Sequence, residues 1–276
     1  MSEQSLSGRT VFMSGGSRGI GLAIAEKLAS HGANVALLAK TDQPHPKLEG
    51  TVHTAADAIR EAGGEALPIV GDVRDADAVD AAVAQAVDKF GGIDIVVNNA
   101  SAITLAPIGD LEVKRFDLMM QINVRGTFVV TKACLPHLRE SDHAHVLTLS
   151  PPIEHPENWV GNNAAYTVSK FGMSMLTLGL AQDEPSISAN CLWPRTMIAT
   201  AAVQNLLGGD QAMAKSRTPA IVADAAYEIL RRKPGEQTGQ ALIDDEVLRA
   251  AGKDDLNEYS ADDADLQLDI FVADWA

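Results

Sequence analysis

Short apolar runs recur along the chain, and each is bounded by residues that favour turns. Their length and their content of β-branched residues indicate strands. Longer amphipathic stretches lie between them, for example at 21–32, 75–91 and 114–138, and these are typical of helices. The predicted strands cover residues 10–14, 34–39, 65–70, 93–98, 144–150, 186–193 and 239–244.

The alternation of strands and helices predicts the fold class. Strands that are apolar along most of their length are covered on both faces, which indicates a parallel sheet between two layers of helices with right-handed connections. Parallel α/β chains of similar length commonly form one domain, and no linker divides the sequence. We therefore expect a single doubly wound α/β domain over residues 1–252, followed by an acidic tail over residues 253–276.

The tail combines many acidic residues with an apolar end. One interpretation is a solvated tail whose terminus frays. The other is that Ile270, Phe271, Val272 and Trp275 dock on the same subunit or on a neighbouring one. The sequence leaves both interpretations open.

The net charge argues against several partners. The chain has 22 Lys and Arg residues against 37 Asp and Glu residues, so its formal charge is −15. This charge repels phosphate backbones and anionic membranes at long range. We therefore expect no nucleic-acid partner and no membrane partner.

Two further features bear on the cellular compartment. Residues 1–10 contain no apolar signal core, and no apolar run approaches the roughly 20 residues of a membrane span. Cys134 and Cys191 both lie in apolar surroundings, which favours buried free thiols in a reducing compartment over a disulfide. These features predict a cytoplasmic protein.

A cluster of glycines follows the first predicted strand and leads directly into a helix. Glycine adopts positive φ and lets backbone amides approach a pyrophosphate, whose charge is favoured at a helix N-terminus. A plain tight turn is the alternative, but the strand-turn-helix context favours a dinucleotide site. The candidate binding residues of this loop are Gly15, Ser17, Arg18, Gly19, Ile20 and Gly21.

The end of the second strand indicates which dinucleotide binds. NAD enzymes place an acidic residue there for the ribose 2′-hydroxyl, whereas this chain has Lys40 followed by Thr41. Arg18 in the glycine loop supplies a second cation, and two cations suit a 2′-phosphate. NADP is therefore favoured, although a solvated Lys40 is an alternative and the nearby Asp42 leaves NAD open.

Tyr166 and Lys170 are four residues apart on a predicted helix, so they share one face. A phenol has a pKa of about 10 in water, and a neighbouring ammonium group favours the phenolate. The pair predicts a tyrosine that donates a proton to a carbonyl as hydride arrives, or takes one from an alcohol. Two such residues one turn apart also occur by chance on many helices.

These motifs together resemble the short-chain dehydrogenase/reductase family. The glycine spacing matches that family, as do Tyr166-x-x-x-Lys170 and the region of Pro194. Matches also occur, in order, at "GDV" 71–73, "NNA" 98–100 and "NVRG" 123–126, so the likeness covers about residues 8–245. A closer likeness, to the hydroxysteroid-dehydrogenase-like branch, lies in "AKTDQPHPKLEGT", "NNASAI", "LTLSPP", "YTVSKFGMSM" and "LWPRT". Some members of that branch carry a further sterol-carrier-like domain, which we do not expect here.

The resemblance implies a seven-stranded Rossmann sheet in the order 3-2-1-4-5-6-7 and several cofactor contacts. Asp72, with Val73 next to it, would bind the adenine, and the asparagines Asn98 and Asn99 would line the adenosine side. Asp72 has the alternative of starting the turn before a helix. Asn98 has the alternative of being a polar strand end.

The resemblance also implies roles around the nicotinamide. Lys170 would lower the pKa of the tyrosine and bond the nicotinamide ribose. Asn123 would hold a water that reloads the proton through Lys170, and an ordinary surface asparagine is the alternative.

Ser150 and the prolines after it depart from the family pattern. Relatives orient the substrate oxygen with a serine a few positions closer to the tyrosine, whereas Ser150 precedes Tyr166 by 16 residues and Pro151 occupies the place of a second serine. Proline fixes φ and ends the strand, so a long loop at 151–163 would let Ser150 take the orienting role. The alternative is a hydroxyl that only closes a strand end. His155 in this loop is expected to be exposed and not catalytic, and no metal-ligand cluster is evident.

The apolar stretch at 196–209 follows "LWPR" and is compatible with helix. Relatives use this region as a lid over substrate and nicotinamide, and such a lid would favour a lipophilic substrate. A helix packed on the core is the alternative.

The sequence thus predicts an NADP(H)-dependent oxidoreductase acting on a small carbonyl or alcohol, assembled as a homodimer or homotetramer. The rival hypothesis is a nucleotide-binding regulatory protein with little or no turnover. Tyr166, Lys170 and Asn123 favour the enzyme, because a sensor need not retain them. A scaffold that only oligomerises leaves the glycine loop unexplained.

Overall fold

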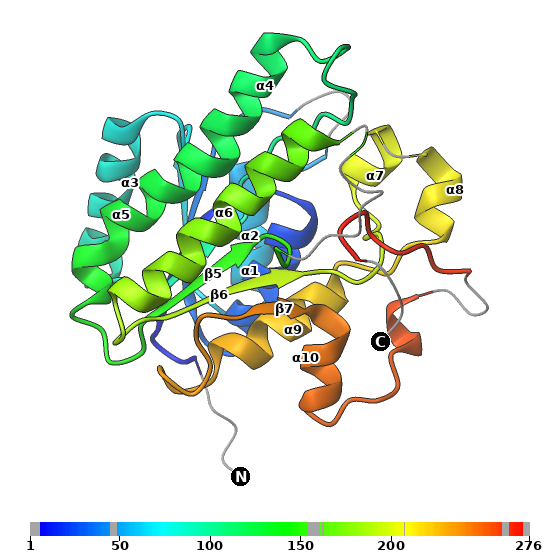
Figure 1. The fold of residues 1–276 in the computed structure, drawn as a ribbon. Coiled ribbons are helices and arrows are strands. Elements are labelled where there is room, and N and C mark those ends of the chain that lie inside the picture. Colours follow the sequence, from blue (N-terminus) through cyan, green and yellow to red (C-terminus); the bar gives the residue numbers. More distant parts are fainter. Residues whose placement is uncertain are drawn as a thin grey trace.

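One parallel sheet forms the centre of the protein. The computed structural model describes residues 6–44, 49–153, 161, 163–206, 208–260 and 265–272. Its seven strands follow the order β3-β2-β1-β4-β5-β6-β7 (Figure 1), which confirms the predicted fold class and strand order. The strands are β1 (Thr10–Ser14), β2 (Asn34–Ala39), β3 (Ala66–Val70), β4 (Ile95–Asn98), β5 (His145–Leu149), β6 (Ser188–Trp193) and β7 (Ala241–Ile243). Every predicted strand is present, with its ends within two residues of the prediction.

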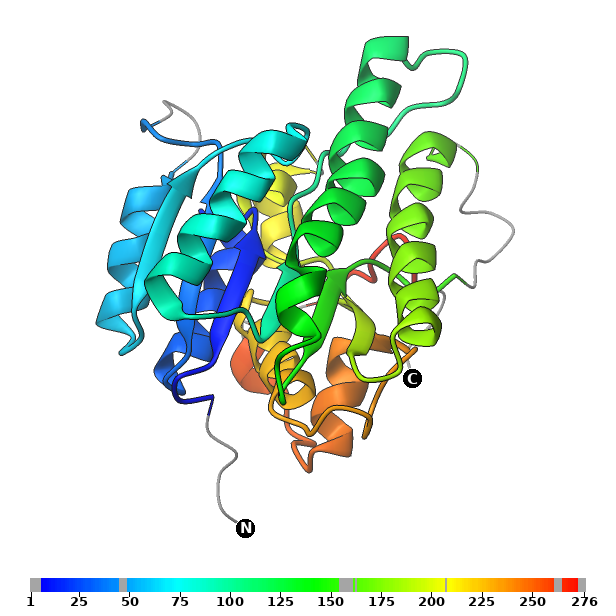
Figure 2. The same cartoon turned by 90° about the vertical axis from the view of Figure 1, so that its left-hand side faces the viewer.

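Helices cover both faces of the sheet. On one face lie α1 (Gly19–Ser30), α2 (Val52–Glu61), α9 (Ala220–Leu230) and α10 (Asp244–Ala250). On the other lie α3 (Ala76–Phe90), α5 (Gly126–Leu138) and α6 (Ala164–Asp183), drawn in cyan and green in Figure 2. Two layers of helix around a parallel sheet are the arrangement that the apolar strands predicted.

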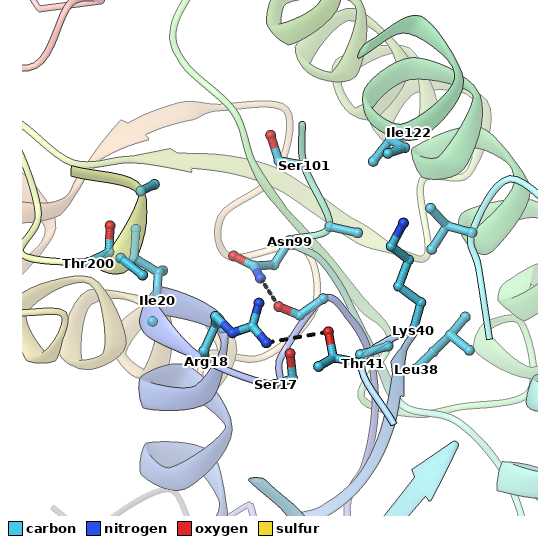
Figure 3. A pocket seen from close by; sticks show the side chains of 18 of the residues that line it. Ser17, Arg18, Ile20, Leu38, Lys40, Thr41, Asn99, Ser101, Ile122 and Thr200 are labelled. Atoms are coloured by element: carbon cyan, nitrogen blue, oxygen red, sulfur yellow. Dashed lines mark hydrogen bonds between the residues drawn. The ribbon is translucent and has the colours of Figure 1, made fainter. Parts of the chain in front are cut away.

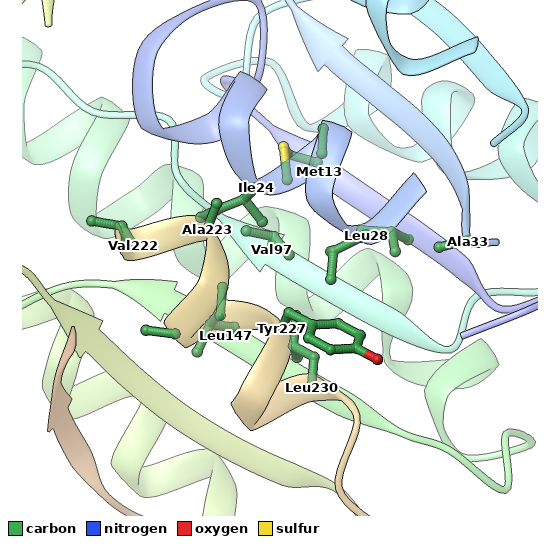
Figure 4. Close-up of a cluster of buried hydrophobic side chains, with 14 of the residues drawn as sticks. Met13, Ile24, Leu28, Ala33, Val97, Leu147, Val222, Ala223, Tyr227 and Leu230 are labelled. Atoms are coloured by element: carbon green, nitrogen blue, oxygen red, sulfur yellow. The ribbon is translucent and has the colours of Figure 1, made fainter. Parts of the chain in front are cut away.

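The alternation of side chains along each strand divides the core into two apolar layers. On β1, Val11 and Met13 pack in the layer beneath α1 and α9, whereas Phe12 between them packs in the opposite layer. Figure 4 shows the first layer, in which Leu28 of α1 and Leu230 of α9 meet below the sheet. Strands buried on both faces hold the loops at their ends in fixed positions.

The long helix predicted at 114–138 has an irregular centre. It begins as α4 (Val113–Met119), continues as a π-helical segment, η1 (Met120–Arg125), and ends as α5. Such wide turns often occur at functional sites. The segment contains Asn123, whose side chain bonds a loop outside the helix.

The loops after β1, β4, β5 and β6 meet at one edge of the sheet, because the carboxyl ends of parallel strands lie together. Two short helices, α7 (Ala201–Leu206) and α8 (Gly209–Ala214), stand at this edge (Figure 1). After α10 the chain passes through η3 (Asn257–Tyr259), and residues 265–272 return toward the end of β6. The candidate site lies at this edge.

Candidate active site

The glycine loop after β1 has no room for side chains. Gly15 has φ +75°, and a Cβ atom there would lie 2.6 Å from the Cα of Ala100. A Cβ on Gly21 would lie 2.4 Å from Nδ2 of Asn99, which donates a 2.6 Å hydrogen bond to the carbonyl of Gly15. The loop and the segment after β4 are therefore packed backbone to backbone, which leaves the N-terminus of α1 open to a ligand.

A cavity of about 710 Å³ lies against this loop (Figure 3). Except for Asn98 and Lys170, its walls include the cofactor residues expected from the sequence. These residues are Gly15, Ser17, Arg18, Gly19, Ile20, Gly21, Lys40, Asp72, Val73 and Asn99. The glycine cradle, the helix N-terminus and the cavity together suit a dinucleotide phosphate group.

Two cationic side chains lie near the end of β2. The Arg18 guanidinium donates from Nε to the carbonyl of Glu49 at 2.9 Å and from NH2 to that of Gly50 at 2.7 Å, and partial burial lowers its pKa. Lys40 lines the same cavity. Asp42 accepts a 2.7 Å hydrogen bond from the ring of His53, which lowers the pKa of the carboxyl, and it does not line this cavity.

The polar residues after β3 and β4 divide into those that face the cavity and those that do not. Asp72 lines the cavity and pairs with Arg74 at 2.7 Å, so its pKa lies below the usual value. Asn98 is 1% exposed and donates to the hydroxyl of Thr131 at 2.9 Å, as expected of a polar strand end. Asn99, rather than Asn98, therefore reaches the cavity.

Asn123 is fully buried, which excludes the ordinary surface asparagine. Its Oδ1 accepts a hydrogen bond from the Ala102 amide at 2.7 Å, and its Nδ2 donates to the Ala102 carbonyl at 3.0 Å. The same Nδ2 donates to the hydroxyl of Ser169 at 2.9 Å. Asn123 thus joins the loop after β4, the η1 segment and helix α6.

Tyr166 and Lys170 lie one turn apart on α6, and both are buried. Lys170 Nζ donates to the Leu149 carbonyl at 2.8 Å and lies 5.0 Å from the centre of the Trp193 ring. Burial lowers the pKa of Lys170 to about 7, so this amine exchanges a proton near neutrality.

The phenol of Tyr166 differs from the sequence expectation. A lowered pKa was predicted, but burial and the carboxylate of Asp269 raise it, while a hydrogen bond with the Ser101 hydroxyl acts in the opposite direction. Because the amine of Lys170 is directed to Leu149, it does not offset the burial of the phenol. Ser101 also lines the cofactor cavity, so this residue borders both the cavity and the phenol.

Ser150 makes no hydrogen bond to Tyr166 through its hydroxyl. It is fully buried, and its hydroxyl forms no hydrogen bond with a nitrogen or oxygen of the described residues. It contacts the thiol of Cys191, whose pKa is raised by burial, and the contact opposes that rise. The orienting role that the sequence suggested for Ser150 stays a prediction. Ser101, which the sequence analysis did not single out, is the serine that contacts Tyr166.

The end of the chain also reaches this centre. Phe271 is 3% exposed, and its ring centre lies 5.7 Å from that of Tyr166. Asp269 accepts a 2.7 Å hydrogen bond from the indole of Trp193. Docking on the same subunit is therefore observed for this segment, whereas Trp275 lies outside the described residues.

The segment expected as a lid borders the cofactor cavity. Thr200, Ala201 and Asn205 line the cavity wall, and Thr200 lies 3.4 Å from the position of a Cβ on Gly19. The stretch around α7 therefore covers the glycine loop rather than the sheet.

The two cysteines are free thiols, as the sequence predicted. Cys134 and Cys191 are buried and free, and burial raises the pKa of both. The described His, Cys, Asp and Glu side chains form no group suited to a metal ion. Among the described helices, none combines the length and apolar character of a bilayer crossing. His155 lies outside the described residues.

A family model places the chain among known proteins. The model of the short chain dehydrogenase family matches residues 9–209, and the chain belongs to this family. A short chain dehydrogenase from Mycobacterium thermoresistibile is 54% identical, with a TM-score of 0.92 over 98% of this chain and 96% of that chain. A short-chain dehydrogenase/reductase from Serratia marcescens is 32% identical, with a TM-score of 0.74 over 86% of this chain and 96% of that chain.

Curated relatives confirm the closer likeness. Hydroxysteroid dehydrogenase-like protein 2 of Xenopus tropicalis is 52% identical over 256 residues, which are 92% of this chain and 61% of that protein. The human protein of the same name is 48% identical over 272 residues, which are 98% of this chain and 65% of that protein. The chain therefore spans less than two thirds of the length of these relatives.

The contact between Ser101 and Tyr166 generates a testable prediction about substrate orientation. If Ser101 and Tyr166 both donate a hydrogen bond to the substrate oxygen, Ser101→Ala should lower kcat by about a hundredfold. This is the usual cost of losing one oriented donor. Ser150→Ala should instead leave the free energy of unfolding nearly unchanged or raise it, because it removes a buried hydroxyl without a nitrogen or oxygen partner, and it should lower kcat less. Steady-state kinetics and thermal unfolding of both variants measure these effects.

Thr104→Val is the matched control for that comparison. Its hydroxyl lies in the same loop and donates only locally, to the carbonyl of Ile103 at 2.9 Å, so we expect wild-type kcat. A larger loss of kcat in Ser150→Ala than in Ser101→Ala would return the orienting role to Ser150.

Proposed function

We propose that this short-chain dehydrogenase is an NADP(H)-dependent oxidoreductase that interconverts a carbonyl and an alcohol, with Tyr166 as acid and base. Family membership supports the oxidoreductase class. One observation carries the reaction type: Ser101 lines the glycine-bordered cavity and also hydrogen-bonds the phenol of Tyr166. The cofactor cavity and the proton donor are therefore adjacent.

The proposed mechanism assigns each polar group a task. A bound NADPH supplies the hydride. Tyr166 gives its proton to the substrate oxygen as negative charge develops there. Lys170, whose pKa is about 7, would return a proton to the phenol of Tyr166. Asn123 fixes the loop after β4 through Ala102, and both hydrogens of its amide are engaged, so it has none to donate to a relay water.

The charge distribution around β2 supports NADP over NAD. Lys40 and Arg18 both line the cavity, and the backbone carbonyls of Glu49 and Gly50 fix the Arg18 guanidinium. The nearby acid, Asp42, is engaged with His53. Cations at this position attract a 2′-phosphate, and NAD stays the alternative.

The surroundings of Tyr166 support a lipophilic substrate. Partly buried side chains of Ile103 and Leu105 pack on the cluster that contains Tyr166, Trp193 and Phe271. Apolar walls of this kind favour the burial of a hydrocarbon substrate.

Subunit association is part of the proposal. Large apolar side chains are exposed on α4, α5 and α6, including Val113 (74%), Phe128 (50%), Val168 (54%) and Met175 (59%). Such side chains on neighbouring helices are typical of interfaces. They support a homodimer or homotetramer, and the sequence features support a cytoplasmic location.

Replacing Tyr166 with phenylalanine tests the reaction. Tyr166→Phe should abolish turnover of a panel of ketones and alcohols followed by NADPH absorbance. Its cofactor affinity should stay nearly unchanged, because the phenol serves the transition state and not the nucleotide. Activity within a few-fold of wild type would remove Tyr166 from the mechanism. Tight cofactor binding without any turnover in the wild-type protein would favour the regulatory hypothesis.

The cofactor preference is tested by titration. NADPH should bind at least about tenfold more tightly than NADH, because charge-assisted hydrogen bonds contribute roughly 1.5–3 kcal/mol. Lys40→Asp should narrow or reverse the preference, since it removes a cation and adds a repulsive charge. The control Lys114→Asp changes a cation of α4 that does not line the cavity. Equal affinities of the wild type for both cofactors would contradict the assignment.

A further inference from the structure

The C-terminal segment, defined as residues 265–272, lies along the stretch that leaves β6. The Met197 amide donates to the carbonyl of Gln267 at 2.9 Å, and the Asp269 amide donates to the carbonyl of Arg195 at 2.9 Å. These backbone bonds fix the register of the segment against the end of the sheet. They place the side chains of residues 269 and 271 at the centre around Tyr166.

Phe271 completes an aromatic group around the tyrosine. Its ring centre lies 5.7 Å from that of Tyr166, 5.8 Å from that of Phe171 and 5.4 Å from that of Trp193. The Trp193 contact is edge to face at 76°, a favourable geometry for aromatic pairs. Tyr166 as a whole residue is 6% exposed, so a substrate that reaches its phenol contacts these aromatic rings.

Asp269 holds one member of this group. Its Oδ1 accepts the 2.7 Å hydrogen bond from Trp193 Nε1 and a 3.2 Å hydrogen bond from the amide of Phe271. The Trp193 ring in turn lies beneath the ammonium group of Lys170 at 5.0 Å. The carboxylate is therefore connected to Lys170 through one indole ring.

We propose that Phe271 of the C-terminal segment is a specificity-determining wall of the substrate site beside Tyr166, and that Asp269 is a positioning residue that fixes Trp193 beneath Lys170. This inference rests on the proposed oxidoreductase function. The aromatic wall suits a ketone or secondary alcohol with a flat or bulky apolar substituent next to the reacting carbon.

The charge of Asp269 also acts on the two ionisable groups of α6. Its carboxylate raises the pKa of both Tyr166 and Lys170, and burial raises its own pKa to about 6. Arg195 lies next to the segment, but its guanidinium pairs with Asp245 at 2.7 Å. Removal of the negative charge should therefore lower the pKa of the phenol and of the amine.

A segment that only stabilises the fold would respond to substitution differently from one that contacts the substrate. Substitution in a purely stabilising segment lowers the melting temperature and changes the kinetics of all substrates equally. Substitution of a residue that contacts the substrate changes KM only for the substrates that contact it. Removal of a charge near the ionising groups shifts the pH profile of kcat.

The first arm of the experiment compares Phe271→Ala, Phe271→Leu and the control Gln267→Ala, whose side chain is exposed on the same segment. With NADPH saturating, KM and kcat are measured for ketones of increasing apolar size. We expect Phe271→Ala to raise KM for the aromatic ketones by about tenfold or more. KM for acetone-sized ketones should change little. Phe271→Leu should raise KM less, with the same dependence on ketone size. Gln267→Ala should have wild-type KM and kcat.

The second arm uses Asp269→Asn, which keeps an acceptor for Trp193 and removes the charge. The ionisation that limits kcat should move to lower pH by about half a unit or more, with NADPH affinity unchanged. A uniform effect of Phe271→Ala on all ketones, or an unmoved pH profile in Asp269→Asn, would overturn the inference. Tyr166→Phe measured beside them distinguishes the two claims: if Tyr166→Phe stays active, the proposed function fails. If Tyr166→Phe is inactive while Phe271→Ala acts uniformly or Asp269→Asn leaves the pH profile unmoved, only the inference fails.

Discussion

The hydrogen bonds between the Asn123 amide and the backbone of Ala102 hold the reacting end of the molecule together. One side chain satisfies both the amide and the carbonyl of Ala102 and bonds Ser169 on helix α6. Because Asn123 is fully buried, losing any of these partners would leave a buried polar group unpaired, which is costly. The loop that carries Ser101 and the helix that carries Tyr166 are therefore fixed relative to each other.

The same centre carries an electrostatic cost. Burial disfavours both the ammonium of Lys170 and the phenolate of Tyr166, so their pKa values shift in opposite directions from those in water. The Leu149 carbonyl and the Trp193 ring face the ammonium and offset part of that cost. Asp269 adds a negative charge that favours the ammonium and opposes the phenolate. In the proposed mechanism, the balance of these groups would set the pH at which a proton passes to the substrate.

Much of this structure was predictable from local patterns. Continuous apolar runs gave the strands, and the glycines around Gly15 gave the loop at the cavity, because both signals depend on neighbouring residues in the chain. The contacts of Ser101, Asp269 and Phe271 depend on residues far away in the sequence. Ser101 resembles any loop serine until the chain folds, and Asp269 resembles the other acids of the tail. The orientation of Ser150 toward Cys191 was equally hidden, since proline fixes the backbone without specifying which way the preceding hydroxyl faces.

Hydride transfer into a carbonyl is tested most directly by following deuterium from the cofactor into the product. A ketone is reduced with NADPH deuterated at C4 of the nicotinamide, using each of the two stereochemical forms in turn, and the alcohol is analysed by mass spectrometry. A nicotinamide held in one orientation presents one face to the substrate, so the proposal predicts deuterium on the carbinol carbon with one form only. Unlabelled alcohol from both forms would contradict hydride transfer at this site.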